Sequence, residues 1–562
     1  MKKVFLFVCL MAALFPGCSD FLDTESKVKK NTDNFPVNED DMYSLLIGAY
    51  SSQIALRQPE TSRDFFVVSE IRSDDRLGGG ESQDRYTAAM NEFLKSDDEM
   101  FAPAWNNYYK GIYRANFLLE SMDKISWTSE ESRKKIEGQT YYIRAYYYFE
   151  LCRLFERVPL RLQTASENLP QATPDELYGQ IASDLKKAID LLPVQKYQDI
   201  PKSELGLATK WAAEALMGRV FLFYTGFYGK AEIALSTGDN ITKDQVVKWL
   251  VDCIDSSGHG LISEYRNLWP YAYCKYYGYV KNHDLNWIGE KGDNYEAVYV
   301  RKYSALGNGG VSQSYDNNVC MFLSHGKQDQ VPFGRGNGMG TVNPKLWNDW
   351  PDEDIRKKGT IYYAYDQEEI EGVSGYKTSP ASIQETGFWS KKYTPINVYK
   401  NGEATPNNPK NMVNMSVDLY GRTASWQQDN STDIMIIRFS DVLLMAAELG
   451  APRAQEYFDR VRKRVGLPSL PASLENIKQE RRWEFACEGI RYWDLMRWGD
   501  LERIMETNMK DIPVTKLGTE TTLTVKYRPE TKGFQPIPES EILLSDGKLE
   551  QNPGWGPDSY YP

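Results

Sequence analysis

Histidine is scarce in this chain, and its scarcity removes one class of site at the outset. Only three histidines occur among 562 residues, His259, His283 and His325, and none forms the HExxH pattern of a zinc site. Their wide spacing offers no local set of metal ligands. The sequence therefore predicts no metal site, and it indicates no other cofactor.

An excess of basic residues is also missing. Asp and Glu outnumber Lys and Arg by 78 to 66, which gives a formal net charge of −12. An acidic chain repels the phosphate backbone, so nucleic acid is not expected as a partner. Aromatic residues, by contrast, are plentiful, with 37 Tyr and 14 Trp. Such rings either pack a large helical core or bind polar, ring-shaped ligands, and composition alone leaves both open.

Cysteine is too sparse and too scattered for a disulfide framework. Besides Cys9 and Cys18, the chain has five cysteines, an odd number with no CxxC pair. Cys152 and Cys487 lie in expected helices and are interpreted as small buried hydrophobic residues. Long apolar runs are absent as well, because no stretch after residue 17 is long enough to cross a bilayer.

The N-terminus indicates export and a lipid anchor. A short basic start precedes an apolar run over residues 4–14, as in a secretory signal. Cys18 directly follows Gly17, and this ending resembles the bacterial lipobox, in which the cysteine becomes the acylated first residue. Ordinary signal cleavage beside a chance cysteine is the alternative. We expect a signal peptide at 1–17 and a lipid anchor and tether at 18–34, with Cys18 as the lipidation site.

Apolar residues recur at helical spacing through the first half of the chain. Thr173 and Glu176 form a capping box with Pro174 at the first helical position. Helices recur about every 30–35 residues, close to the tetratricopeptide period of about 34. The sequence therefore predicts a mainly α fold, a tetratricopeptide-like solenoid of helix pairs. The helical stripes lie at 42–50, 105–119, 136–154, 174–193 and 208–224, with Gly226 just beyond the last.

A long irregular insert is expected from about 259 to 430, where Gly, Pro, Asn and Tyr replace the helical stripes. Short strand-like runs at 297–300 and 434–439 bracket its loops. A stretch of this kind inside a compact protein is usually functional. We expect an N-terminal helical part over 35–235 and a C-terminal part over 236–562 that carries the insert. Helices are predicted again at 440–449, 453–465 and about 474–505.

Three blocks of the C-terminal part resemble the motifs of one known family. Asp459–Pro468 resembles the N-x-V-R-x-R-A-G-L-P signature of SusD/RagB-like outer-membrane lipoproteins, with Asp for Asn and Val for Ala. Glu480–Phe485 and Glu488–Gly499 resemble that family's E-R-R-x-E-[FL] and E-G-x-R-x-x-D-L-x-R-W-G block. Phe534–Pro538 and Gln551–Trp555 resemble its F-x-P-I-P and Q-N-P-G-[YW] ending. The resemblance also touches short segments of the N-terminal half.

The resemblance implies a protein anchored on the outside of the outer membrane that pairs with a SusC-like, TonB-dependent transporter. Family members bind an oligosaccharide over that barrel and make or break no covalent bond, so the chain is not expected to be an enzyme. Two other classes stay open. A surface glycosidase would need two carboxylates within about 5–10 Å of each other in a cleft. A peptide-capturing lipoprotein would use the same fold, since a fold does not fix its ligand.

Two segments are candidates for the ligand face. Sugar recognition needs aromatic faces for C–H groups and polar groups for hydroxyls. The dense aromatic segment 265–287 lacks a helical stripe, so we expect some of its rings to form an exposed platform; packing onto the scaffold is the alternative. Asp and Arg side chains before Gly78–Gly80 are expected to bind paired hydroxyls, unless this is a flexible, solvated loop. The predicted ligand-binding residues are Asp74, Arg76, Trp269, Tyr271, Tyr273, Tyr276 and Trp287.

Two further patterns are assigned to structure rather than to chemistry. Charged residues over 480–497 alternate with Trp and Phe at helical spacing, which predicts a charge ladder of Glu484, Glu488 and Arg491 along one helix face. A catalytic carboxylate pair is the alternative there. The glycine-rich run 334–340 superficially resembles a phosphate loop, but no strand precedes it and no helix follows it. It is interpreted as a flexible loop.

Overall fold

The computed structural model describes residues 35–54, 64–96, 99–289, 293–303, 317–326, 332–366, 376, 378–399, 412–420 and 430–562. The signal peptide, Cys18 and the tether lie outside these ranges, so their assignment stays a prediction. In the described part of the chain, every helix is too short or too polar to span a bilayer.

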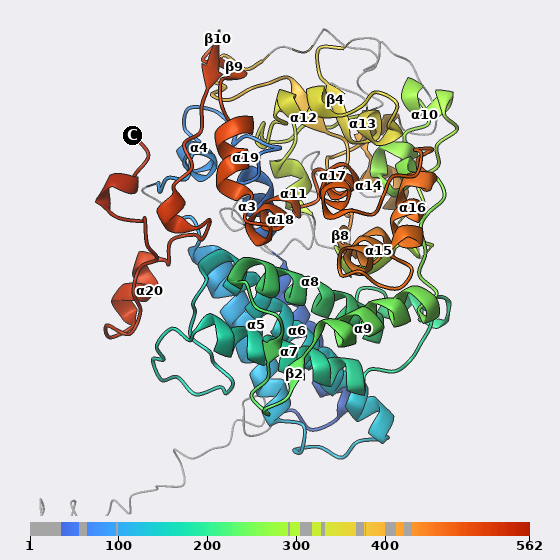
Figure 1. Cartoon of the computed structure of the whole chain (residues 1–562), viewed down its shortest axis with the longest axis vertical. Coiled ribbons are helices and arrows are strands. Elements are labelled where there is room, and N and C mark those ends of the chain that lie inside the picture. Colours follow the sequence, from blue (N-terminus) through green and yellow to red (C-terminus); the bar gives the residue numbers. More distant parts are fainter. Residues whose placement is uncertain are drawn as a thin grey trace, which may run out of the picture.

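The lower half of the molecule is a stack of long helices (Figure 1). Helices that follow each other in the chain pack on each other, from α5 on α6 through to α8 on α9. This arrangement confirms the prediction of a mainly α, tetratricopeptide-like solenoid of helix pairs. The long helices are α2 (Glu39–Tyr50), α5 (Ala102–Glu120), α6 (Glu130–Phe155), α7 (Pro174–Leu191), α8 (Lys210–Tyr228) and α9 (Lys243–Ser256).

Helix boundaries follow local sequence signals, with one exception. The Thr173 backbone N–H donates to Glu176 Oε2 at 2.8 Å, and the Thr173 hydroxyl accepts from the Glu176 N–H, which confirms the capping box. Gly226, expected just beyond α8, lies inside it. A Cβ atom there would be 2.5 Å from the Arg497 carbonyl oxygen, so glycine permits a close helix contact. The helix ends instead at Gly229, whose φ of +64° suits glycine.

The upper half combines short helices with two-stranded antiparallel sheets (Figure 1). The strand pairs there are β3 (Ala297–Arg301) with β8 (Ile434–Arg438), β4 (Ile361–Tyr363) with β5 (Phe388–Ser390), β6 (Asn397–Tyr399) with β7 (Met412–Asn414), and β9 (Ile512–Lys516) with β10 (Thr519–Leu523). A further pair, β1 (Ile233–Ala234) with β2 (Asn240–Ile241), packs on α7 and α8 of the helical stack. The short helices are α3 (Phe65–Ile71), α4 (Arg85–Asn91), α10 (Gly278–Asn282), α11 (Asn318–Phe322), α12 (Pro344–Asp349), α13 (Ile355–Thr360), α14 (Met415–Tyr420) and α20 (Glu539–Leu544). The 3₁₀ turns are η2 (Ser51–Gln53), η4 (Tyr197–Asp199), η5 (Lys202–Glu204), η6 (Tyr265–Leu268), η7 (Pro270–Tyr273), η10 (Pro529–Thr531) and η11 (Pro557–Ser559).

The two strands expected to bracket the long loops of the insert are present and pair with each other. In the β3–β8 ladder, Val300 lies opposite Met435. After β8 the helical stack resumes, because α15 (Phe439–Glu448) packs on both α9 and α16 (Ala454–Arg464). The chain between β3 and β8, which is the larger part of the insert, therefore starts and ends at one small sheet.

The helix expected over 474–505 is broken into three pieces, α17 (Leu474–Glu484), α18 (Arg491–Arg497) and α19 (Leu501–Asn508). Cys487 and Gly489 between the first two have positive φ, which no α-helix allows.

The predicted charge ladder on one face is therefore wrong, since Glu484 and Arg491 belong to different helices. Each charge instead has a partner from elsewhere in the chain. Glu484 pairs with Arg356 and Arg438, at 3.0 and 2.7 Å.

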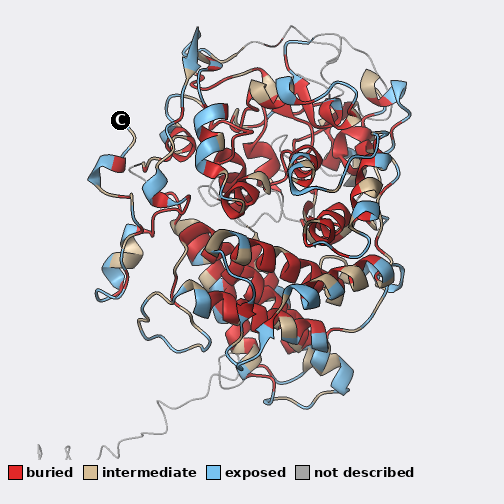
Figure 2. Cartoon of the chain, in the orientation of Figure 1, coloured by how far each residue is buried: buried red, intermediate tan, exposed pale blue. Residues whose placement is uncertain are grey.

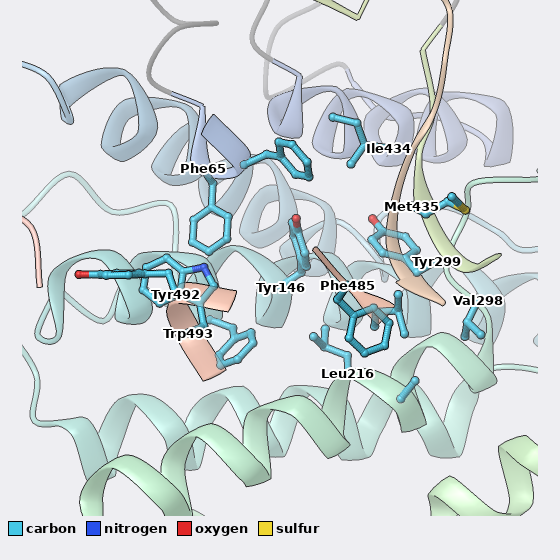
Figure 3. Close-up of a cluster of buried hydrophobic side chains, with 14 of the residues drawn as sticks. Phe65, Tyr146, Leu216, Val298, Tyr299, Ile434, Met435, Phe485, Tyr492 and Trp493 are labelled. Carbon is cyan, nitrogen blue, oxygen red and sulfur yellow. The ribbon is translucent and has the colours of Figure 1, made fainter. Parts of the chain in front are cut away.

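The core joins the helical stack to the upper half. Trp493 of α18 stacks on Phe65 of α3, with ring centroids 5.1 Å apart, and its Nε1 donates to Ser69 at 2.8 Å (Figure 3). Tyr299 of β3 meets Tyr146 of α6 edge-on at 5.8 Å. Figure 2 shows that the stacked helices are largely buried, whereas β10 and α20 have no buried residues. Both cysteines expected in helices, Cys152 and Cys487, are buried, although Cys487 lies in the break after α17.

Candidate ligand-binding surface

Asp74, one of the predicted ligand-binding residues, is fully buried. Its carboxylate accepts hydrogen bonds from Arg491 Nε at 2.8 Å and from Asn508 Nδ2 at 2.7 Å. Burial alone would raise the pKa of this carboxyl, but the guanidinium groups of Arg491 and Arg482 outweigh burial and hold the pKa below its usual range. In this structure the Asp74 carboxylate is bound by protein groups, and its expected contact with sugar hydroxyls stays a prediction.

Arg76 is buried in the same way and for a related reason. Its Nε lies 2.7 Å from Glu70 Oε2, and its Nη1 donates to the Gly340 carbonyl at 2.9 Å. The whole segment from Asp74 to Gly80 runs alongside the glycine-rich run 334–340 and the residues after it, and the Gly340 N–H donates to the Gly78 carbonyl at 2.9 Å. Both glycine-rich loops are therefore hydrogen-bonded to each other, and neither is a free, solvated loop.

Trp269 and Tyr271 are also fully buried, so the expectation that they form an exposed platform is wrong. The short turns η6 and η7 point these rings inward. Trp269 meets Tyr393 edge-on at 5.6 Å and lies beneath Lys392, whose Nζ is 4.6 Å from the ring centroid. The Tyr271 hydroxyl donates to the Gly359 carbonyl at 3.0 Å. Both residues instead pack the insert onto the scaffold, as the alternative interpretation expected.

Tyr273, Tyr276 and Trp287 are half-buried and keep one side toward solvent. Tyr273 and Trp287 meet edge-on at 6.1 Å, and the Tyr273 hydroxyl donates to Asp418 Oδ2 at 2.8 Å. Tyr276 lies edge-on to Tyr399 at 5.6 Å. The ligand-binding role of these three stays a prediction, and the segment as a whole is divided between core and surface.

A second group of aromatic residues forms a continuous row on the surface of the insert. We call it the aromatic strip and define it as Trp347 of α12, Phe388 of β5, Tyr363 of β4 and Tyr365 just after β4. Neighbouring ring centroids lie 5.7, 4.6 and 5.4 Å apart along this order. Tyr363 and Tyr365 are 38% and 39% exposed, and the other two are half-buried. A row of partly exposed rings is the shape that successive sugar units stack on.

Strand geometry explains why these rings share a face. Side chains alternate along β4, so Tyr362 is buried against Phe333 at 4.0 Å while Tyr363 points outward. The β4–β5 register places Tyr363 directly opposite Phe388. Gly387 is required beside them, because its φ is +79° and a Cβ there would lie 2.7 Å from Tyr365 and 2.8 Å from Tyr363.

The charged groups at the border of the strip are paired with each other. Lys357 lies with its Nζ 4.6 Å from the Trp347 ring and 2.5 Å from Asp352 Oδ1. Lys345 pairs with Asp349 at 3.0 Å. The strip therefore offers partly exposed rings with balanced charges beside them, which suits a neutral ligand better than a charged one.

Beneath the strip lies a buried carboxyl. Glu385 Oε1 accepts the Gly387 N–H at 2.8 Å. Burial raises the pKa of Glu385 to about 7, and the Gly387 N–H and nearby side chains oppose that rise. Glu385 is therefore a group next to Gly387 and Tyr365 whose charge changes near neutral pH.

Sequence reasoning missed the strip, although one signal for it was present. Residues 361–365 read Ile-Tyr-Tyr-Ala-Tyr, and in a strand this spacing puts Tyr363 and Tyr365 on one face. No local pattern joins Trp347 and Phe388 to them, because strand pairing across the insert does so. In the described residues, no group of three or more His, Cys, Asp or Glu is arranged to hold a metal ion.

Comparison with known proteins supplies the context for this site. The model of the SusD family matches residues 279–555, and a second model, described as starch-binding associating with outer membrane, matches residues 20–222. A SusD-like protein from Bacteroides ovatus is 23% identical over 537 residues, which is 89% of this chain and 83% of the relative. SusD-like protein P2 from Formosa agariphila is also 23% identical, over 99% of this chain and 100% of the relative.

Solved structures show the same fold. A laminarin binding SusD-like protein superposes with a TM-score of 0.71 at 24% identity, covering 92% of this chain and all of that one. Surface glycan-binding protein A from Bacteroides thetaiotaomicron, in complex with laminarihexaose, gives a TM-score of 0.68 at 21% identity over 92% of this chain and 100% of that chain. Since the two family models between them cover both halves of the chain, and its relatives align along most of its length, this protein belongs to the SusD family.

Proposed function

We propose that this protein is a cell-surface lipoprotein that binds a glycan and delivers it to a TonB-dependent transporter of the outer membrane. The observation that carries the proposal is the aromatic strip, a row of partly exposed rings fixed on a small sheet. Aromatic faces stack on the C–H faces of sugar rings, and the row extends along the surface as a chain of sugars does. The protein acts by capture and performs no bond-breaking chemistry.

Relatives support this ligand class. The two structural neighbours are named for binding laminarin or solved with laminarihexaose, and the N-terminal family model is described as starch-binding. A glucan is therefore the first class of ligand to test. Delivery to a SusC-like partner and attachment through Cys18 follow from family membership and from the lipobox-like N-terminus.

The strip is tested by removing single rings. Tyr363→Ala and Trp347→Ala should each weaken oligosaccharide binding by about 1–3 kcal/mol, or roughly 5- to 150-fold in Kd, because binding energy concentrates in a few aromatic side chains. Calorimetry with laminarihexaose and a panel of other oligosaccharides measures the effect. Tyr43→Ala is the matched control, since Tyr43 is 42% exposed on α2, outside the strip.

Each outcome has a clear reading. Wild-type affinity in both strip variants, with melting temperature unchanged, would place the glycan site elsewhere. Cleaved sugar in the recovered ligand, seen by chromatography, would make the protein a glycosidase. Binding of peptides in place of every oligosaccharide would favour the peptide-capturing class.

A further inference from the structure

A pocket distinct from the strip lies between the α7–α8 connector and the β3–β8 sheet. Its cavity has a volume of about 80 Å³ and is partly open, so it takes a small ligand or one unit at the end of a larger ligand. Val298 and Met435 form part of its wall, and Figure 3 shows both beyond Tyr299, away from Trp493. The polar and aromatic wall residues include Tyr197, His259, Trp287, Asn294, Lys302 and Asp433.

His259, one of the wall residues, has a buried hydrogen-bond acceptor that is not used. Its Nδ1 lies 2.9 Å from the Tyr295 carbonyl oxygen, which can only accept, so Nδ1 carries the proton. Burial lowers the pKa of His259 to about 4, despite that hydrogen bond, so the ring is neutral at neutral pH. Nε2 is then a bare acceptor, and among the described residues it has no hydrogen-bond partner. The side chain is only 8% exposed, so bulk water reaches it poorly.

Asn294 provides a second acceptor of the same kind. Its Nδ2 donates to Met435 Sδ at 3.3 Å, while its buried Oδ1 has no partner in the described part of the chain. An unmatched buried polar atom costs about 1–3 kcal/mol. Two such acceptors in the wall of one pocket, at His259 and Asn294, match a ligand that brings hydrogen-bond donors.

The remaining wall indicates that the ligand is neutral. Lys302 forms an ion pair with Asp433, and Glu204 forms one with Lys135 at 2.8 Å. The charges of these wall residues are therefore neutralised within the protein and do not require a charged ligand. Gly206 lets Lys302 take this position, because a Cβ there would lie 2.1 Å from Lys302 Cγ. Apolar side chains and the Trp287 ring complete the surface, the usual composition of a small-molecule site.

We propose that this pocket binds a single neutral sugar unit, with His259 Nε2 and Asn294 Oδ1 accepting hydroxyl hydrogens and Trp287 packing against the ring. The choice of sugar among neutral hydroxyl donors rests on the proposed function, but the pocket and its unmatched acceptors do not. The pocket is a second site, separate from the strip, for a free monosaccharide or for the end or branch unit of a glycan.

The test uses the full mature chain and methyl glycosides of glucose, galactose and mannose as probes, with saturation-transfer NMR and titration. At least one glycoside should bind, and Asn294→Ala and Trp287→Ala should each weaken that binding about tenfold or more. Both residues are half-buried, so these variants are expected to fold, and melting curves check this. Tyr43→Ala on α2, outside both the strip and the pocket, is the control and should leave glycoside binding unchanged.

Three results would overturn the inference. One is that no methyl glycoside binds at millimolar concentration. Another is that binding survives both pocket variants, which would place the bound glycoside outside the pocket. The third is a crystal soaked in the glycoside that shows only water in the pocket. Laminarihexaose binding with the strip variants is measured in parallel, so a failed pocket and a failed glycan-capture function give different results.

Discussion

Buried ion pairs account for charged side chains of the family motifs in this structure. Arg438 Nη1 lies 2.7 Å from Glu484 Oε1 and 2.6 Å from Glu296 Oε1, and all three side chains are buried. Burial would raise the pKa of Glu484, but Arg464, Arg438 and Arg356 hold it well below the usual value. Removing one member of such a set leaves an uncompensated charge in the core. These motif residues therefore serve the fold, and the ligand site must be sought elsewhere.

Glu385, beneath the strip, should make stability depend on pH near neutrality. Its pKa is raised to about 7 from an ordinary value of 4.5, so the folded state binds the proton more tightly than the unfolded state. The resulting stabilisation is fully present below pH 4.5 and is lost as pH rises through 7. Its size is at most about 3 kcal/mol. Urea unfolding of wild type and Glu385→Gln at several pH values should show the difference between them change over this window.

The glutamine variant retains an oxygen that can accept the Gly387 N–H but cannot ionise. Other carboxyls titrate equally in both proteins and cancel in the comparison. Parallel pH profiles for the two proteins would show that Glu385 titrates normally. Glycan affinity measured over the same pH range shows whether ionisation of Glu385 changes ligand binding at the strip.

The helices and turns differ in how well the sequence predicts them. The long helices and the capping box at Thr173 follow from apolar spacing and local chemistry, and both are present. The break between α17 and α18 was not predicted, because Cys487 takes a positive φ without any sequence signal for it. The turns η6 and η7 carry aromatics with no period, so sequence alone did not say that Trp269 and Tyr271 face the core. Tertiary packing determines that these two rings face the core.

Helix α18 depends on Trp493, which ties it to α3. Trp493→Ala should lower the free energy of unfolding by about 3–5 kcal/mol, the usual cost of deleting a large buried aromatic. The ring stacks on Phe65, bonds to Ser69, and lies 5.1 Å from the Arg153 guanidinium, so several contacts disappear together. Denaturant unfolding measures the change, and glycan specificity of the folded fraction should stay as in wild type.

Trp249→Ala on α9 is the matched control, since Trp249 is only half-buried. Its loss should cost clearly less. A Trp493→Ala protein of normal stability that no longer binds glycan would move this residue from the scaffold to the ligand site.

At the scale of the whole molecule, long-range pairing decides where the candidate sites lie. The strip joins α12 to the β4–β5 sheet, and the pocket joins the α7–α8 connector to the β3–β8 sheet. Strands β3 and β8 are more than 130 residues apart in the chain, as the Lys302–Asp433 pair beside them shows. Motifs and periodicity predicted the family and the solenoid, but they do not indicate which distant segments pair. The burial of Asp74 was missed for the same reason, since its partners Arg491 and Asn508 are more than 400 residues away in the chain.

The described fold begins before α2, with the Asn38 side chain capping that helix, so the anchor and the folded part are expected to act independently. Cys18→Ala should remove acylation and release the protein from membranes, because without acyl chains nothing else in the tether is apolar enough to hold it.

Melting temperature and laminarihexaose affinity should equal those of a soluble form lacking residues 1–18, since neither the strip nor the pocket uses the tether. Membrane fractionation and calorimetry on the same preparations check both halves of this expectation. A variant that stays firmly in the membrane fraction would rule out Cys18 as the anchor. A variant that is released but has lost glycan binding would show that the tether takes part in the ligand site.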